Sequence, residues 1–299
     1  MTSRFPTLLR REWMQHRRGY LVLMGVPPLL LLLTILFAPG VQADPKEPTM
    51  IMAIAMAAVT GLVSSIVWIA MALQLPGLAR RDTQDRSIEF WSSLPVSHSA
   101  SVGATLVMHG LLVPLLAVCV GFVSSLVVGV ALVGVVLGPG AWAHMSWGVL
   151  AATGLAGFAR LLFGLCLATL WIAPLLLVPM VASAALKRWG VPVVVATAGI
   201  GGLVLDKLYG ITVVGDTLGA LVQHAGQALL HVKNQEPDME VRIGKNGEHI
   251  TDVLAMFPEW VAHDALMAVR DLASPLFLFA MVVGIASFAA LVQLRRRAA

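Results

Sequence analysis

Six apolar stretches, each about as long as a membrane-spanning helix, constrain this chain more than any other feature. They lie near residues 20–38, 51–78, 102–137, 160–186, 190–208 and 273–294. About 20 apolar residues in a helix cross a hydrocarbon core of about 30 Å, and a helix satisfies its own backbone hydrogen bonds in lipid. Only 12% of the 299 residues are charged, against about 25% in soluble domains. The sequence therefore predicts an all-α integral membrane protein with six transmembrane helices.

The basic residues predict the orientation of this protein. Six spans place both termini on one side of the membrane, and 13 of the 20 Lys and Arg residues lie on that side with only four of the 16 acidic residues. Short loops rich in Lys and Arg stay in the cytoplasm. Both termini and the loop at 80–101 are therefore expected to be cytoplasmic. Because the basic residues are dispersed over membrane boundaries, they do not indicate a nucleic-acid partner.

Residues 3–18, SRFPTLLRREWMQHRR, precede the first span. Phe5, Leu8, Leu9 and Trp13 recur at helical spacing among arginines, which is typical of a helix lying in the membrane interface. The alternative is a positive-inside anchor with no further role.

Residues 80–101, RRDTQDRSIEFWSSLPVSHSAS, form a charged loop between the second and third spans. The pattern predicts a short cytoplasmic helix over 82–94, because Pro95 disfavours continuation beyond it. A solvated loop has no need of the Phe90-Trp91 pair, so either the ends of the chain's own spans or another protein must cover these rings. The polar and charged residues of the predicted helix include Asp82, Asp85, Arg86 and Glu89.

Residues 209–272 form the one sizeable outer segment, between the fifth and sixth spans. Helical patterns at 213–232 and 252–272 flank a stretch in which Asn246-Gly247 gives a strong hairpin-turn signal. The sequence predicts a small external cap of two helices and a hairpin.

Arg160 lies at the predicted start of the fourth span, about 39 Å from the cytoplasmic end of that helix at 1.5 Å per residue. It is expected to reach the outer boundary with its long side chain; a buried functional charge is the alternative. Cys119 and Cys166 lie within predicted spans and are expected to be apolar-like thiols, although a disulfide is open if these spans adjoin.

The order of these features resembles the ABC type-2 exporter permeases, most closely their small bacterial members. The shared features are an amphipathic N-terminal helix ending in RREWMQHRR, six spans, a cytoplasmic helix reading DRSIEFWSSLPVS, and an outer segment between spans five and six. The resemblance covers essentially the whole chain through topology, and its sequence support lies in the two cytoplasmic motifs.

The resemblance implies that residues 82–94 are the coupling helix, which docks into a groove of a separate cytoplasmic ATPase, and that residues 3–18 form the connecting helix. It also implies two permeases and two ATPases per transporter, in a homodimeric or heterodimeric unit, of which a homodimer of this chain is the expected form. The implied ATPase contacts are Asp82, Asp85, Arg86, Glu89, Phe90 and Trp91, and the implied connecting-helix residues are Arg10, Arg11, Glu12 and Trp13.

The chain contains no G-x-x-x-x-G-K-[ST] phosphate loop. ATP and Mg²⁺ are therefore expected on the partner ATPase, and this chain is expected to be a transport subunit without cofactors or enzymatic activity of its own. The expected function is a permease of a bacterial inner membrane, surrounded by lipid, that moves a hydrophobic or amphipathic substrate out of the cytoplasm.

Two other function classes are weighed against this one. A self-contained secondary transporter or channel would place ionisable groups in mid-membrane, and the predicted spans hold almost none. A polytopic membrane enzyme would need catalytic or metal-binding groups in its spans, but His109 is the only histidine well placed in one, and no carboxylate lies near it in sequence. His224 and His231 are seven residues apart, but without an HExxH or paired-Cys motif no metal site is expected.

Overall fold

The computed structural model describes residues 4–37, 48–81, 97–230 and 250–298. All regular elements among these residues are helices, and no strand occurs in them, as expected for an all-α membrane protein. The helices in chain order are α1 (Arg4–Phe37), α2 (Pro48–Leu78), α5 (His98–Val107), η1 (Met108–Leu112), α6 (Val113–Leu137), η2 (Pro139–His144), α7 (Trp147–Leu186), η3 (Lys187–Trp189), α8 (Gly190–Ala196), η4 (Thr197–Gly201), α9 (Gly202–Tyr209), α10 (Val213–Leu229), α12 (Ile250–Arg270), η5 (Asp271–Ala273) and α13 (Pro275–Ala298).

Five of the described helical stretches are long enough and apolar enough to cross a membrane. They are Phe5–Phe37, Pro48–Leu78, His98–Leu137, Trp147–Tyr209 and Pro275–Arg297. The fourth contains both of the predicted spans near 160–186 and 190–208, because helical structure continues through the reversal at η3. The protein is therefore a helical, membrane-embedded one, and its number of crossings depends on how this fourth stretch lies in the bilayer.

Two predicted elements lie outside the described residues. These are the cytoplasmic helix over 82–94 and the hairpin around Asn246-Gly247. The two helices expected to flank the hairpin are present as α10 and α12, each within three residues of its predicted ends.

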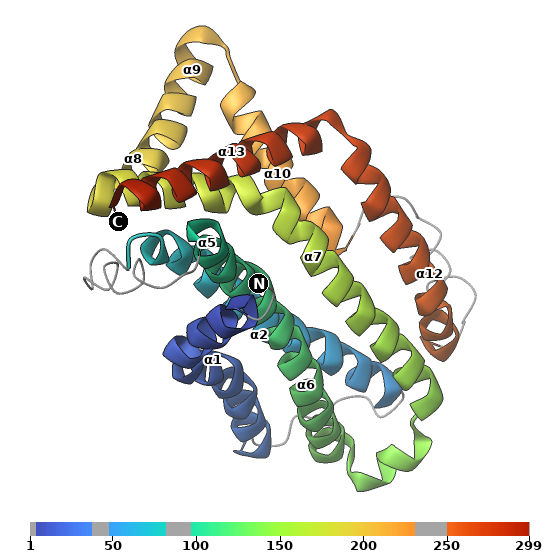
Figure 1. Ribbon diagram of the computed structural model, residues 1–299. Coiled ribbons are helices and arrows are strands. Elements are labelled where there is room, and N and C mark those ends of the chain that lie inside the picture. The colour runs from blue at the N-terminus through green and yellow to red at the C-terminus, as the bar shows by residue number, and fades with distance from the viewer. Residues whose placement is uncertain (1–3, 38–47, 82–96, 231–249, 299) are drawn as a thin grey trace.

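Helix α1 runs without interruption from the basic N-terminal segment into the first apolar stretch. The sequence predicts a separate interfacial helix over 3–18, but the structure joins it to the span. A single glycine costs a helix only about 1 kcal/mol, so Gly19 does not stop the hydrogen-bonding pattern. Figure 1 shows that the helix changes direction between its N-terminal part and its C-terminal end. A displacement of the basic part is therefore passed directly into the apolar part.

Helices α5 and α6 form one long span that is interrupted by the π-helical segment η1. Pro114, at the start of α6, has no backbone N–H and so leaves the carbonyl of Gly110 without its usual helical donor. Thr169 of α7 lies beside this position, and its hydroxyl is shared between the Leu165 carbonyl of its own helix at 2.8 Å and the Gly110 carbonyl at 3.3 Å. A π-helical turn within an α-helix is often found at a functional site, and η1 contains His109.

Helix α7 is the longest described helix, about 60 Å at 1.5 Å per residue, and it packs against α2, α10, α12 and α13. It begins at Trp147, 13 residues before the predicted fourth span. Helix α12 packs along this first part, where Thr153 Oγ1 donates to the Leu254 carbonyl at 2.8 Å. In Figure 1, α12 and α13 follow α7 along its length. Helix α10 runs antiparallel to it, since Ala228 lies near Arg160 whereas His224 stacks on Trp171.

The chain reverses direction after α7 within a few residues. Lys187 has a φ of 55°, in the left-handed region that non-glycine residues rarely adopt. Gly190 then packs directly against the backbone of Ala182 and Ser183 in α7, leaving no room for a Cβ atom. This close approach lets α8 leave the end of α7, and Figure 1 shows α8 and α9 extending away from the other helices to meet α10.

The C-terminal end of α2 and the helix α5, which lie on either side of the 82–94 segment in the sequence, pack against the C-terminal parts of α7 and α13. Leu75 near the end of α2 and Val102 of α5 share one buried apolar cluster with Met180 and Leu291. A second cluster joins α1 to α2 and α6. The end of α2 and the start of α5 are therefore both built into the helix bundle.

Candidate functional site

A buried ion pair joins the N-terminal helix to the end of α2. The Glu12 side chain is fully buried, and its two carboxylate oxygens accept hydrogen bonds from Arg81 at 3.0 and 3.2 Å. Arg11 donates to the same carboxylate. A buried carboxylate is tolerated only when it is paired, so these two arginines account for the burial of Glu12. Arg81 immediately precedes the segment predicted as the coupling helix.

The four predicted connecting-helix residues differ in how far their side chains are exposed. Arg10 is exposed and Arg11 is half-buried. Glu12 is buried in the ion pair, and Trp13 is half-buried against the apolar cluster formed by α1, α2 and α6. The structure therefore leaves Arg10 as the member of this set with the most open side chain. The predicted contacts Asp82, Asp85, Arg86, Glu89, Phe90 and Trp91 lie outside the described residues.

Two histidines lie beside the Glu12 ion pair. His16 is one helical turn after Glu12, and His109 comes from η1; their rings meet edge to face with centroids 5.2 Å apart. Tyr20 packs against both rings. The spacing of Glu12 and His16 is a signal the sequence does carry, because residues four apart share one face of a helix. The sequence does not indicate that His109, from another helix, lies next to Glu12 and His16.

Arg160 is held in a second buried ion pair, at the interface of α7, α10 and α12. It is only 3% exposed and Asp264 only 4%. Its Nε donates to Asp264 Oδ2 at 2.7 Å, and its Nη1 donates to the Ala228 carbonyl at 2.7 Å. The expectation that Arg160 extends to an outer boundary is wrong, because two helices distant in sequence cover it. The alternative of a buried charge is the one observed.

Gly164 makes this arrangement sterically feasible. A Cβ atom at this position would lie 2.5 Å from the Ala228 carbonyl oxygen and 2.6 Å from Arg160 Nη1. The missing side chain lets α10 approach α7 closely enough to present its last carbonyls to the arginine.

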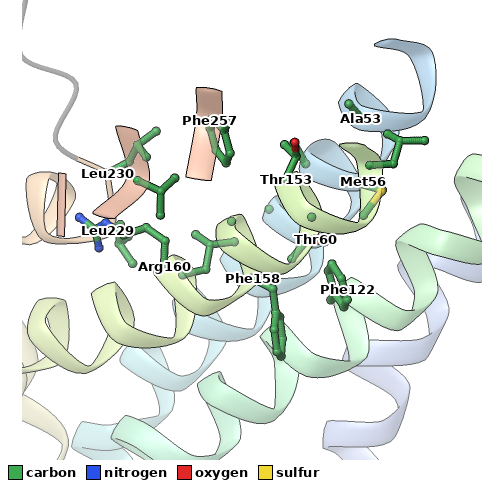
Figure 2. Close-up of a pocket in the computed structure, with 17 residues that line it drawn as sticks. Ala53, Met56, Thr60, Phe122, Thr153, Phe158, Arg160, Leu229, Leu230 and Phe257 are labelled. Atoms are coloured by element: carbon green, nitrogen blue, oxygen red, sulfur yellow. The ribbon is translucent and has the colours of Figure 1, made fainter. Parts of the chain in front are cut away.

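An apolar pocket with a volume of about 270 Å³ lies beside this ion pair, between α2, α6, α7 and α12. Figure 2 shows aromatic and aliphatic side chains around it, including Met56, Phe122, Phe158 and Phe257, while the Arg160 guanidinium lies at one end near Leu229. The hydroxyl of Thr153 is occupied by a bond to the Leu254 carbonyl at 2.8 Å. The pocket is therefore suited to an apolar group, such as a hydrocarbon chain, and presents no acid–base pair to it.

The other sequence candidates have ordinary structural surroundings. His224 stacks on the buried Trp171 with ring centroids 4.5 Å apart, and its Nδ1 is 3.9 Å from Asp271. His263 is exposed, and His231 lies outside the described residues. Cys119 and Cys166 are both free thiols, so no disulfide joins the third and fourth predicted spans.

Comparison of the chain with protein-family models, with curated proteins and with solved structures finds no match. The function must therefore be argued from the residues and their geometry.

Proposed function

We propose that this chain is the membrane-spanning permease subunit of an ATP-driven exporter whose ATPase is a separate protein. The observation that carries the proposal is the buried Glu12–Arg81 ion pair. It ties the N-terminal helix to the last described residue before the 82–94 segment, where the sequence resemblance places the coupling helix. ATP and Mg²⁺ would be bound by the partner ATPase.

In a permease that is powered by another protein, a movement of the segment that binds the ATPase must be transmitted to the membrane-spanning helices. The contacts around 82–94 support such a transfer at both ends of the segment. Arg81 is paired with Glu12 of α1, and Val102 is packed with Met180 of α7 and Leu291 of α13. A displaced segment would therefore act on α1 and α2 through the ion pair, and on α7 and α13 through the apolar cluster.

In this proposal the chain crosses a bacterial inner membrane six times with both termini in the cytoplasm, and residues 190–208 form the fifth crossing. Two copies assemble with two ATPases. The apolar pocket supports a hydrophobic or amphipathic substrate, because its lining offers van der Waals contact and little polar recognition.

The first test is purification of the tagged chain from its native membrane, followed by mass spectrometry. We expect a stoichiometric protein with a phosphate-binding loop to accompany the chain, and we expect it to be lost when Phe90 and Trp91 are both replaced by Ala. Aromatic anchors commonly dominate binding energy at such interfaces. Trp147→Ala, which removes an aromatic side chain that is 49% exposed, is the matched control and should retain the partner. A chain that purifies alone would argue against the proposal.

The second test addresses the ion pair. Arg81→Gln should leave the ATPase bound but reduce substrate-stimulated ATP hydrolysis at least tenfold, since α1 would no longer follow the docking segment; Arg11 remains as a counter-ion for Glu12. Hydrolysis and transport are measured in reconstituted vesicles. Arg18→Gln, which removes the same charge from an exposed position of α1, should have little effect. If both changes reduced ATP hydrolysis equally, the effect would come from the lost positive charge and not from the Glu12–Arg81 ion pair.

One observation favours a second candidate, a self-contained ion-coupled transporter. The buried Arg160–Asp264 pair beside the pocket is the kind of ionisable group that such transporters use. Transport that persists in vesicles without ATP, and that is abolished by changes at this pair, would support it over the ATP-driven permease.

A further inference from the structure

Three side chains that metal ions commonly use meet where α1 crosses η1. Glu12, His16 and His109 each offer one ligand atom, and these atoms lie within 4.8 Å of one another. Glu12 and His109 are fully buried, and His16 is half-buried. Two of the three are adjacent on one face of α1, and the third is presented by a π-helical turn. π-Helical turns within α-helices are frequently found at functional sites.

The hydrogen bonding of His109 leaves one of its ring nitrogens free to bind a metal ion. Its Nδ1 lies 3.0 Å from the Thr105 carbonyl oxygen. A carbonyl only accepts, so Nδ1 carries the proton and donates. Nε2 is buried and has no hydrogen-bond partner among the described residues, which leaves its lone pair unused at a cost that folded proteins usually avoid. A histidine that binds a metal through one nitrogen typically donates its other N–H to a carbonyl or carboxylate in this way.

His16 supplies the adjustable ligand and a route for entry. Its Nδ1 lies 3.3 Å from the Glu12 carbonyl oxygen, and its ring is partly open to the surroundings. Zinc binds histidine nitrogen and carboxylate oxygen at about 2.0–2.2 Å, which places ligand atoms about 3.4 Å apart around a tetrahedral ion. The three ligand atoms lie within 4.8 Å of one another, so their separations would have to shorten by no more than about 1.4 Å for a tetrahedral ion.

We propose that Glu12, His16 and His109 form a binding site for a transition-metal ion of the zinc class, and that Arg81 competes with this ion for the Glu12 carboxylate. Two imidazoles and one carboxylate suit zinc, cobalt or nickel better than calcium or magnesium. In the structure the carboxylate is paired with Arg81 and Arg11, and these positive charges oppose a bound cation. The ion must therefore take Glu12 away from Arg81, which loosens the connection between α1 and the end of α2. The site stands independently of the proposed transport function.

The site is tested with the purified full-length chain, carrying no polyhistidine tag and stripped with a chelator. Co²⁺ is titrated in while its visible d–d absorption is recorded, and Zn²⁺ is then added to displace it. We expect one saturable Co²⁺ site per chain. His16→Ala should weaken binding at least tenfold and change the absorption spectrum, because a ligand is lost from a half-buried position without opening the core. Arg81→Gln should strengthen binding at least tenfold, because it removes the competitor.

Two further variants make the outcome decisive. His144→Ala removes an exposed histidine far along the chain in η2 and should leave Co²⁺ affinity unchanged. His109→Gln should abolish the d–d bands even where the protein retains its helical circular dichroism. Absence of saturable binding, or binding that His16→Ala and His144→Ala weaken equally, would overturn the proposal. Weaker binding in Arg81→Gln would overturn the competition between the arginine and the ion.

Discussion

Replacing Asp264 by Leu is expected to lower the free energy of unfolding by about 3 to 5 kcal/mol, the cost of leaving one member of a buried ion pair without its partner. Arg160 would keep its bond to the Ala228 carbonyl, but its positive charge would remain within the α7–α10–α12 interface without a counter-ion among the described residues. The measurement is the denaturation midpoint of the purified protein in lipid nanodiscs.

The double variant Arg160→Met with Asp264→Leu separates the charge effect from the loss of packing. Apolar replacement of both members of a buried pair is often neutral or stabilising, so the double variant should recover most of the stability that the single variant loses. Asp206→Leu is the control, because its pair with Lys207 is solvent-exposed and such pairs contribute about 1 kcal/mol or less. If the double variant were as unstable as Asp264→Leu, the unpaired charge would not be the cause.

Gly190→Ala is expected to destabilise the protein by at least about 3 kcal/mol, the upper part of the range for overpacked sites. The added Cβ would overlap the backbone of Ala182 and Ser183. Neither contact is with a side chain that could rotate away, so α8 must move off the end of α7. The expected readouts are a lower denaturation midpoint and a larger distance between spin labels placed on α7 and α8.

Gly199→Ala provides a control with the opposite sign. No atom lies within 4 Å of the Cβ it would introduce, and alanine favours a helix over glycine by up to about 1 kcal/mol. This variant should therefore be neutral or slightly stabilised. Similar losses in both variants would mean that the glycines act through chain flexibility, and the close approach of α8 to α7 would not explain the effect.

Much of the helical layout was predictable from local patterns. The ends of α10 and α12 follow from helical periodicity in the outer segment, and the apolar runs identify the membrane-spanning stretches. The start of α7 was not predicted, because the charge of Arg160 suggests the end of a span, although residues 147–159 before it are uncharged and mostly apolar. Residues 147–159 continue the helix beyond Arg160 and pack against α12, for example through Thr153 and the Leu254 carbonyl.

The sequence by itself determined that this is a helical membrane protein, because long apolar runs leave a helix as the structure that satisfies every backbone group in lipid. Only the tertiary structure decided how its few buried charges are compensated. Arg160 finds Asp264 at a separation of 104 residues, and Glu12 finds Arg81 at a separation of 69. His109 likewise has a carboxylate nearby in space although none is close in sequence. Electrostatic interactions depend on distance and burial in three dimensions, and neither is encoded in the local pattern around a single charged residue.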